Sequence, residues 1–70
     1  MRYMVVIEEG ENSFGAFVPD LPGCVAVAES EQEVRELIQE AISFHLEDLQ
    51  HEGAPLPPPH CHSEFIEIPA

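Results

Sequence analysis

Short apolar stretches separated by polar turns fill the first thirty residues and predict three β-strands. The strands cover residues 3–7, 14–18 and 24–28, and each is rich in β-branched, aromatic or small apolar side chains. Glycine and asparagine lie between the first two strands, as a hairpin turn needs, and Pro19 ends the second because proline cannot donate to a ladder. Three consecutive strands with short links predict an antiparallel meander.

The next segment carries strong helix signals and predicts one long helix. Ser30 and Glu33 form a capping box, in which each side chain accepts a hydrogen bond from a backbone N–H at the helix start. Gly53 is expected to end the helix in the left-handed conformation. At about 100° per residue, an apolar stripe follows one face of the helix: Val34, Ile38, Ala41, Ile42, His45 and Leu49.

The end of the sequence predicts a stiff connector and a further strand. Residues 54–63 are rich in proline and should be extended, and residues 64–68 show the alternation of a final strand. The expected fold is therefore α+β, in the order β-β-β-α-β, as a single domain whose core is residues 1–53. The helix should bury its stripe against one face of the sheet.

The charge balance is strongly acidic. The sequence has 14 Asp and Glu residues against two basic ones, Arg2 and Arg35, for a net charge of −12. This charge repels phosphate backbones and anionic lipids, so neither nucleic acid nor a membrane is an expected partner of this chain alone. A basic protein would be attracted, although the same acidity also serves solubility by itself.

Length and cysteine content indicate how the chain is stabilised and in which compartment it is expected. A domain of 70 residues buries only roughly 60% of its unfolded surface, so help from self-association is expected. No apolar run approaches the ~20 residues of a membrane span, and no targeting segment is expected before the first strand. Cys24 and Cys61 are expected to be free thiols in a reducing compartment, which indicates the cytoplasm.

The link between the second and third strands has a distinctive composition. Its two prolines restrict the backbone, Asp20 can hydrogen-bond nearby backbone groups, and Gly23 permits a positive φ. These residues alone indicate a rigid, well-formed turn. In chain order the turn consists of Pro19, Asp20, Leu21, Pro22, Gly23 and Cys24.

This turn, in its context, resembles the HicB-like antitoxin family. The family shows a first strand ending in Ile-Glu, an acidic hairpin, an aromatic strand, the Pro-Asp-Leu-Pro-Gly-Cys turn, a small strand and a capped helix. The resemblance covers residues 3–50. It implies a partial RNase H-like fold and a protein that binds and neutralises HicA, a small basic ribonuclease toxin resembling a double-stranded-RNA-binding domain. Longer members carry a C-terminal DNA-binding module, which is not expected here after Gly53.

Two acidic sets and one apolar set are candidate contact surfaces. The helix face opposite the stripe and the first hairpin each offer carboxylates to a basic partner, unless they are simply solvated. The sheet face away from the helix and one off-stripe aromatic could meet a second copy, giving a homodimer or higher oligomer. The partner candidates are Glu8, Glu9, Glu11, Glu36, Glu40 and Glu47; the oligomer candidates are Met4, Val6 and Phe44.

Two other functions remain as alternatives. Solitary members of the family exist, so the chain could be an oligomeric binding module without a toxin. A metal-dependent RNase H-like nuclease would need several converging carboxylates, and Glu8 and Asp20 alone do not supply them. We therefore expect no enzyme and no cofactor. The weak metal candidates are His60, Cys61 and His62, which are more simply a surface loop before the last strand.

Overall fold

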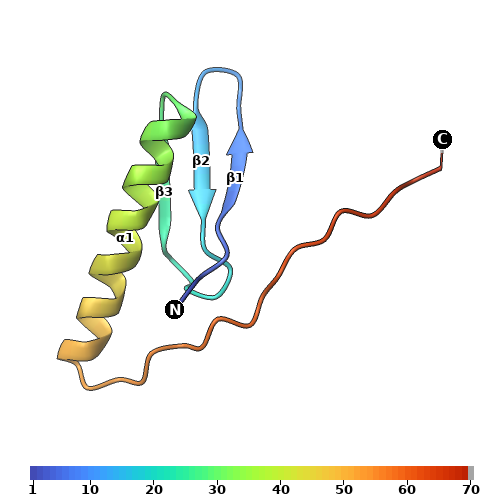
Figure 1. The fold of residues 1–70 in the computed structure, drawn as a ribbon. Helices are drawn as coiled ribbons and strands as arrows, with labels where there is room; N and C mark the ends of the chain where they lie inside the picture. Colours follow the sequence, from blue (N-terminus) through green and yellow to red (C-terminus); the bar gives the residue numbers. More distant parts are fainter. Residues whose placement is uncertain (70) are drawn as a thin grey trace.

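A three-stranded antiparallel sheet and one long helix make up the fold (Figure 1). The structure is a computed structural model and describes residues 1–69. Strand β1 covers Val6–Glu9, β2 covers Phe14–Phe17 and β3 covers Val25–Ala28. Helix α1 follows at Glu31–His51. The strand order β1-β2-β3 confirms the expected meander and the α+β class.

Strand β1 begins later than the sequence pattern predicts. Val6 pairs with Phe17 at the end of the β1–β2 ladder. The next residue of the second strand, Val18, donates its N–H to the Cys24 carbonyl, at 3.2 Å, inside the following turn. Residues 3–5 therefore have no ladder partner in β2, although Tyr3 and Val5 still pack against the core.

The helix begins and ends as its sequence signals predict. Ser30 Oγ accepts a hydrogen bond from Glu33 N at 3.1 Å, which satisfies a backbone donor of the first turn. Glu52 is the C-terminal capping residue, and Gly53 has a φ of 72°. A left-handed residue suits glycine at this place because it has no Cβ to clash.

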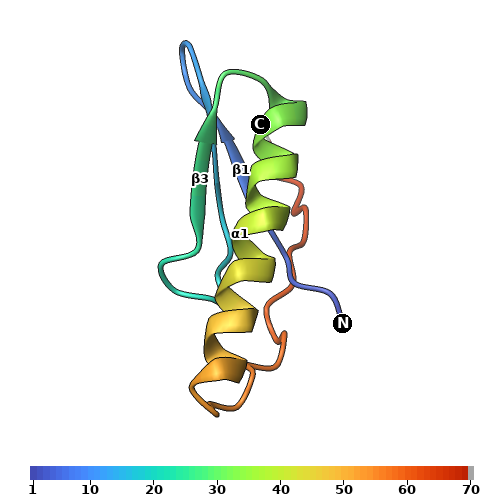
Figure 2. The same cartoon turned by 90° about the vertical axis from the view of Figure 1, so that its left-hand side faces the viewer.

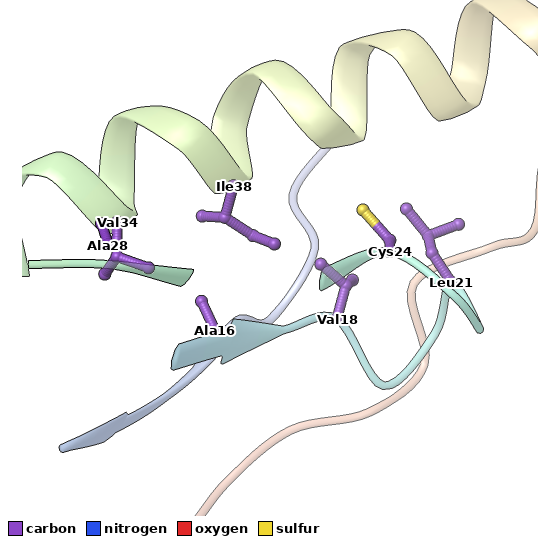
Figure 3. Packing of buried hydrophobic residues seen from close by; sticks show 7 residues of the cluster. All are labelled: Ala16, Val18, Leu21, Cys24, Ala28, Val34 and Ile38. Carbon is purple, nitrogen blue, oxygen red and sulfur yellow. The ribbon is translucent and has the colours of Figure 1, made fainter. Parts of the chain in front are cut away.

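The core lies between α1 and one face of the sheet, so the domain has two layers (Figure 2). Small side chains on the strands, including Ala16 and Ala28, let Val34 and Ile38 of the helix approach closely (Figure 3). Figure 3 labels the seven buried members of the core: Ala16, Val18, Leu21, Cys24, Ala28, Val34 and Ile38.

The opposite face of the sheet is apolar and uncovered within residues 1–69. Val25 and Val27 of β3 are 62% and 69% exposed. Val25 lies beside Phe17, which in turn pairs with Val6, so these three side chains share the face. The alternation of valine and alanine in β3 thus turns the small residues toward the helix and the larger ones toward solvent.

The expected final strand over residues 64–68 is wrong for this structure. The segment after the helix is extended but forms no strand within the described residues, and it runs away from the sheet (Figure 1). Phe65, Ile66 and Ile68 are all exposed. Alternation alone cannot make a strand, because the ladder and the burial both require a neighbour that this segment does not reach.

Candidate functional site

The Pro19-to-Cys24 turn is built from its own backbone hydrogen bonds. Leu21 N donates to the Val18 carbonyl at 3.0 Å, and Cys24 N donates to the Leu21 carbonyl at 3.1 Å. Gly23 has a φ of 86°, a left-handed conformation that the turn needs and that glycine adopts without strain. Leu21 and Cys24 point into the core, and burial raises the pKa of the Cys24 thiol.

Asp20 fastens this turn to the C-terminal segment. Its side chain is fully buried, and Oδ2 accepts hydrogen bonds from His60 N at 3.1 Å and Cys61 N at 3.2 Å. From the sequence, we expected the Asp20 side chain to hydrogen-bond to nearby backbone groups. The observed donors instead lie 40 and 41 residues further along the chain, where no local pattern could indicate them.

The second oxygen of Asp20 has a different environment. His60 Nδ1 lies 2.8 Å from Oδ1, yet no nitrogen or oxygen donor of the described residues is aligned to hydrogen-bond to this oxygen. Hydrogen bonding to the Cys61 side chain lowers the pKa of Asp20 more than burial raises it, and the two backbone N–H groups lower it further. The same carboxylate raises the pKa of Cys61.

The proline-rich connector is held at more than one point. Tyr3 Oη donates a hydrogen bond to the Pro57 carbonyl, shortly before the two backbone bonds to Asp20. The connector thus passes below the N-terminus in the view of Figure 1 and then reaches the Pro19-to-Cys24 turn. Beyond Cys61 the described chain is exposed through residue 69.

The structure brings the acidic helix residues together around an aromatic side chain. Glu36, Glu40 and Glu47 line a shallow hollow of about 570 Å³ on α1, together with Phe44. Phe44 is 73% exposed. The sequence placed Phe44 with a self-association surface and the three glutamates with a partner surface, whereas the structure gathers all four at one place.

The other candidate residues lie apart from this hollow. Glu8 and Glu9 end β1, and Glu11 lies in the exposed hairpin that follows. Met4 and Val6 are half-buried. The more exposed apolar residues of the open sheet face, Val25 and Val27, were absent from the sequence-based candidates, although the alternation of β3 was a usable signal.

The tail and the turn together create a cluster of metal-ligating side chains. Ligand atoms of Asp20, His60 and Cys61 all lie within 4.8 Å of one another. His62 is outside this cluster and lines a neighbouring hollow of about 740 Å³ with Cys61 and Arg2. The sequence therefore identified two members of the cluster, missed Asp20 and included His62.

The fold and its motif turn define a small β-β-β-α domain with an acidic helix surface. The chain belongs to the HicB-like antitoxin family: residues 3–69 match the family described as the HicB_like antitoxin of bacterial toxin-antitoxin systems. A chain of a solved HicA3 and HicB3 toxin-antitoxin complex is structurally similar, with a TM-score of 0.65 and 31% identity. The similarity covers 83% of this chain and 72% of that one.

Three curated proteins give sequence matches of different extent. An uncharacterized 14.9 kDa protein of Haemophilus phage HP1 is 32% identical over 99% of this chain, which spans only 52% of the phage protein. A UPF0150 protein of Helicobacter pylori is 49% identical over 71% of this chain and 69% of its own length. One from Archaeoglobus fulgidus is 42% identical, over 67% of this chain and 70% of its own.

Within residues 1–69, no helix combines the length and the apolar character needed to cross a bilayer.

Proposed function

We propose that this chain is an antitoxin domain that binds and neutralises a small basic ribonuclease toxin of the HicA type, in the cytoplasm. Its family and its 31% identity to a chain of a solved HicA3 and HicB3 complex support this proposal. The net charge of −12 supplies the attraction for a basic partner that must otherwise bind RNA.

The observation that carries the proposed binding surface is the hollow on α1. Three glutamates line it together with an exposed aromatic side chain, and no lysine occurs in the chain to neutralise them. Glu36 and Glu40 are one helical turn apart, so their repulsion costs about 0.2–0.5 kcal/mol. A cationic partner removes this cost, and Phe44 offers an aromatic anchor of the kind that dominates interfaces.

The test is a search for a small basic protein encoded beside this chain, followed by co-expression and co-purification of the two. We expect a complex that weakens steeply with salt. The triple substitution E36Q/E40Q/E47Q should weaken binding by at least about tenfold, through a slower association rate. The matched control E8Q/E9Q/E11Q removes the same charge from the hairpin and should have a smaller effect.

Two outcomes count against this proposal. The absence of any complex at low salt argues against the toxin partner. If E8Q/E9Q/E11Q loses more affinity than E36Q/E40Q/E47Q, the binding surface lies on the first hairpin and not on the helix. In both cases, circular dichroism of the variants checks that the fold is retained.

The open sheet face favours a second candidate, a solitary oligomeric binding module. Val25 and Val27 expose apolar surface that a second copy could cover. We expect self-association under both functions. They differ in that a solitary binding module has no basic protein encoded beside it.

We propose that the chain has no nuclease activity of its own. A metal-dependent nuclease needs several carboxylates on its ions, whereas the metal-ligating cluster found in residues 1–69 contains one, Asp20. An RNA-cleavage assay with magnesium or manganese tests this proposal. Metal-dependent cleavage by the pure chain would support the nuclease function instead.

A further inference from the structure

We propose that Asp20, His60 and Cys61 bind a divalent transition-metal ion of the zinc type, which joins the C-terminal segment to the motif turn. This inference is independent of the toxin partner. It depends on the donor set, the spacing of the donors, an unsatisfied buried oxygen and the access to the cluster.

The donor set matches this class of ion. A carboxylate oxygen, an imidazole nitrogen and a thiolate sulfur are the three ligand types that structural and catalytic zinc sites combine. Magnesium and calcium prefer oxygen ligands alone, so a site with one nitrogen and one sulfur selects against them.

The spacing is close to that of a ligated ion. His60 Nδ1 lies 2.8 Å from Asp20 Oδ1, and the other ring nitrogen, Nε2, lies 3.9 Å from Cys61 Sγ, so an ion would take only one of these two nitrogens. Ligands held about 2.0–2.3 Å from zinc in a tetrahedral arrangement are separated from one another by roughly 3–4 Å. Three donor atoms within 4.8 Å of one another can therefore meet on one ion by side-chain rotation.

The independent indication of a ligand is Asp20 Oδ1. This oxygen is buried and has no aligned nitrogen or oxygen donor in residues 1–69, although His60 Nδ1 lies 2.8 Å away. Leaving a buried acceptor unsatisfied costs free energy, and more when the acceptor is charged. An ion on Oδ1 removes this cost. The two backbone N–H groups on Oδ2 hold the carboxylate with Oδ1 toward the cluster, as outer hydrogen bonds do for metal ligands.

The cluster is open to solvent on one side. The His60 side chain is 76% exposed, and Cys61 lines the hollow that it shares with Arg2 and His62. An ion can enter from this side, and a water molecule can complete a fourth position. With three protein ligands, the ion links residues 20 and 60, which lie far apart in the sequence.

The experiment uses the full chain, reduced and stripped of metal, titrated with cobalt(II) and zinc(II). We expect one cobalt ion per chain, with a thiolate-to-cobalt charge-transfer band and the visible absorption of a tetrahedral site. The C61S and H60Q substitutions should each weaken binding by at least about tenfold, and C61S should also abolish the charge-transfer band. The matched controls H62Q and H51Q should leave both readouts unchanged.

A second measurement addresses Asp20 without substituting a buried residue. Zinc addition should shift the carboxyl ¹³C resonance of Asp20 in the wild-type chain, and C61S should need a higher zinc concentration for the same shift. The proposal is overturned if the wild-type chain shows no thiolate band, if C61S binds as tightly as the wild type, or if H62Q loses as much affinity as H60Q. A ratio of one ion to two chains also overturns it.

Discussion

Asp20 and Leu21 are neighbours in the chain and are both buried, for opposite physical reasons. Leu21 has no exposed surface and adds its apolar side chain to the core, whereas Asp20 is buried because the C-terminal segment covers it and donates to it. The turn therefore serves two functions at once. Leu21 stabilises the domain through the hydrophobic effect, and Asp20, the residue before it, determines where the tail lies.

Replacing Leu21 with alanine should destabilise the domain by about 2–5 kcal/mol, since it removes buried methyl groups and leaves a cavity. A chain of 70 residues has only roughly 4–10 kcal/mol of stability to lose. L37A is the matched control, because Leu37 is more than a third exposed, and it should cost much less. Urea unfolding of both variants measures the difference; equal losses would show that Leu21 is not a core residue.

Helix α1 depends on its first turn as well as on its buried face. Ser30 Oγ satisfies the N–H of Glu33, and Glu31 and Glu33 place negative charge at the positive end of the helix dipole. Only Val34 and Ile38 of the helix are fully buried. With so few buried residues, the capping interactions contribute a substantial share of what stabilises the helix.

The S30A substitution should lower the free energy of unfolding by about 0.5–2 kcal/mol, because Glu33 N loses its acceptor. The matched control is S43A, a change at an exposed position within the same helix. There alanine should be neutral or slightly stabilising, because its helix propensity is higher. Thermal unfolding followed by circular dichroism compares the two, and a loss in S43A as large as in S30A would contradict the capping argument.

Elements whose signals are local could be predicted from the sequence. The capping box, Gly53 and the turn residues act within a few positions, so the helix bounds and the meander followed from the pattern. The strand expected over residues 64–68 failed because a strand needs a partner, and alternation does not say whether one is within reach. Its apolar residues remain exposed in the structure.

The candidate site was predictable only in part, for the same reason. Helical periodicity placed Glu36, Glu40 and Glu47 on one face, and they do share one hollow. Asp20 contacts His60 and Cys61, which lie 40 and 41 residues further along the chain. No periodic pattern in the sequence indicates such a contact. Such a contact depends on the path of the connector, which only the tertiary structure supplies.

At the scale of the whole molecule, charge and apolar surface act in opposite directions. The net charge of −12 makes identical copies repel each other. The open face with Val25 and Val27 draws them together. Salt screens the repulsion between charges that lie more than about a Debye length apart and leaves the apolar attraction in place.

Self-association should therefore strengthen as sodium chloride is raised, whereas binding to a basic toxin should weaken. We expect a homodimer or higher oligomer at micromolar concentration. V27E should weaken self-association by at least about tenfold, because it places an unpaired charge in the interface. Q50E adds the same charge at an exposed position of α1 and serves as the control. Analytical ultracentrifugation at two salt concentrations tests this, and a monomeric wild type would contradict it.

The bond between Asp20 and the tail also sets how much of the chain contributes to the stability of the domain. A fragment ending at Gly53 retains every strand and the helix, yet it removes both backbone donors from a fully buried carboxylate. The loss of these two hydrogen bonds and of the segment that covers Asp20 should lower the stability of the fragment. The part of the chain that stabilises the domain therefore extends to Cys61, beyond the last regular element.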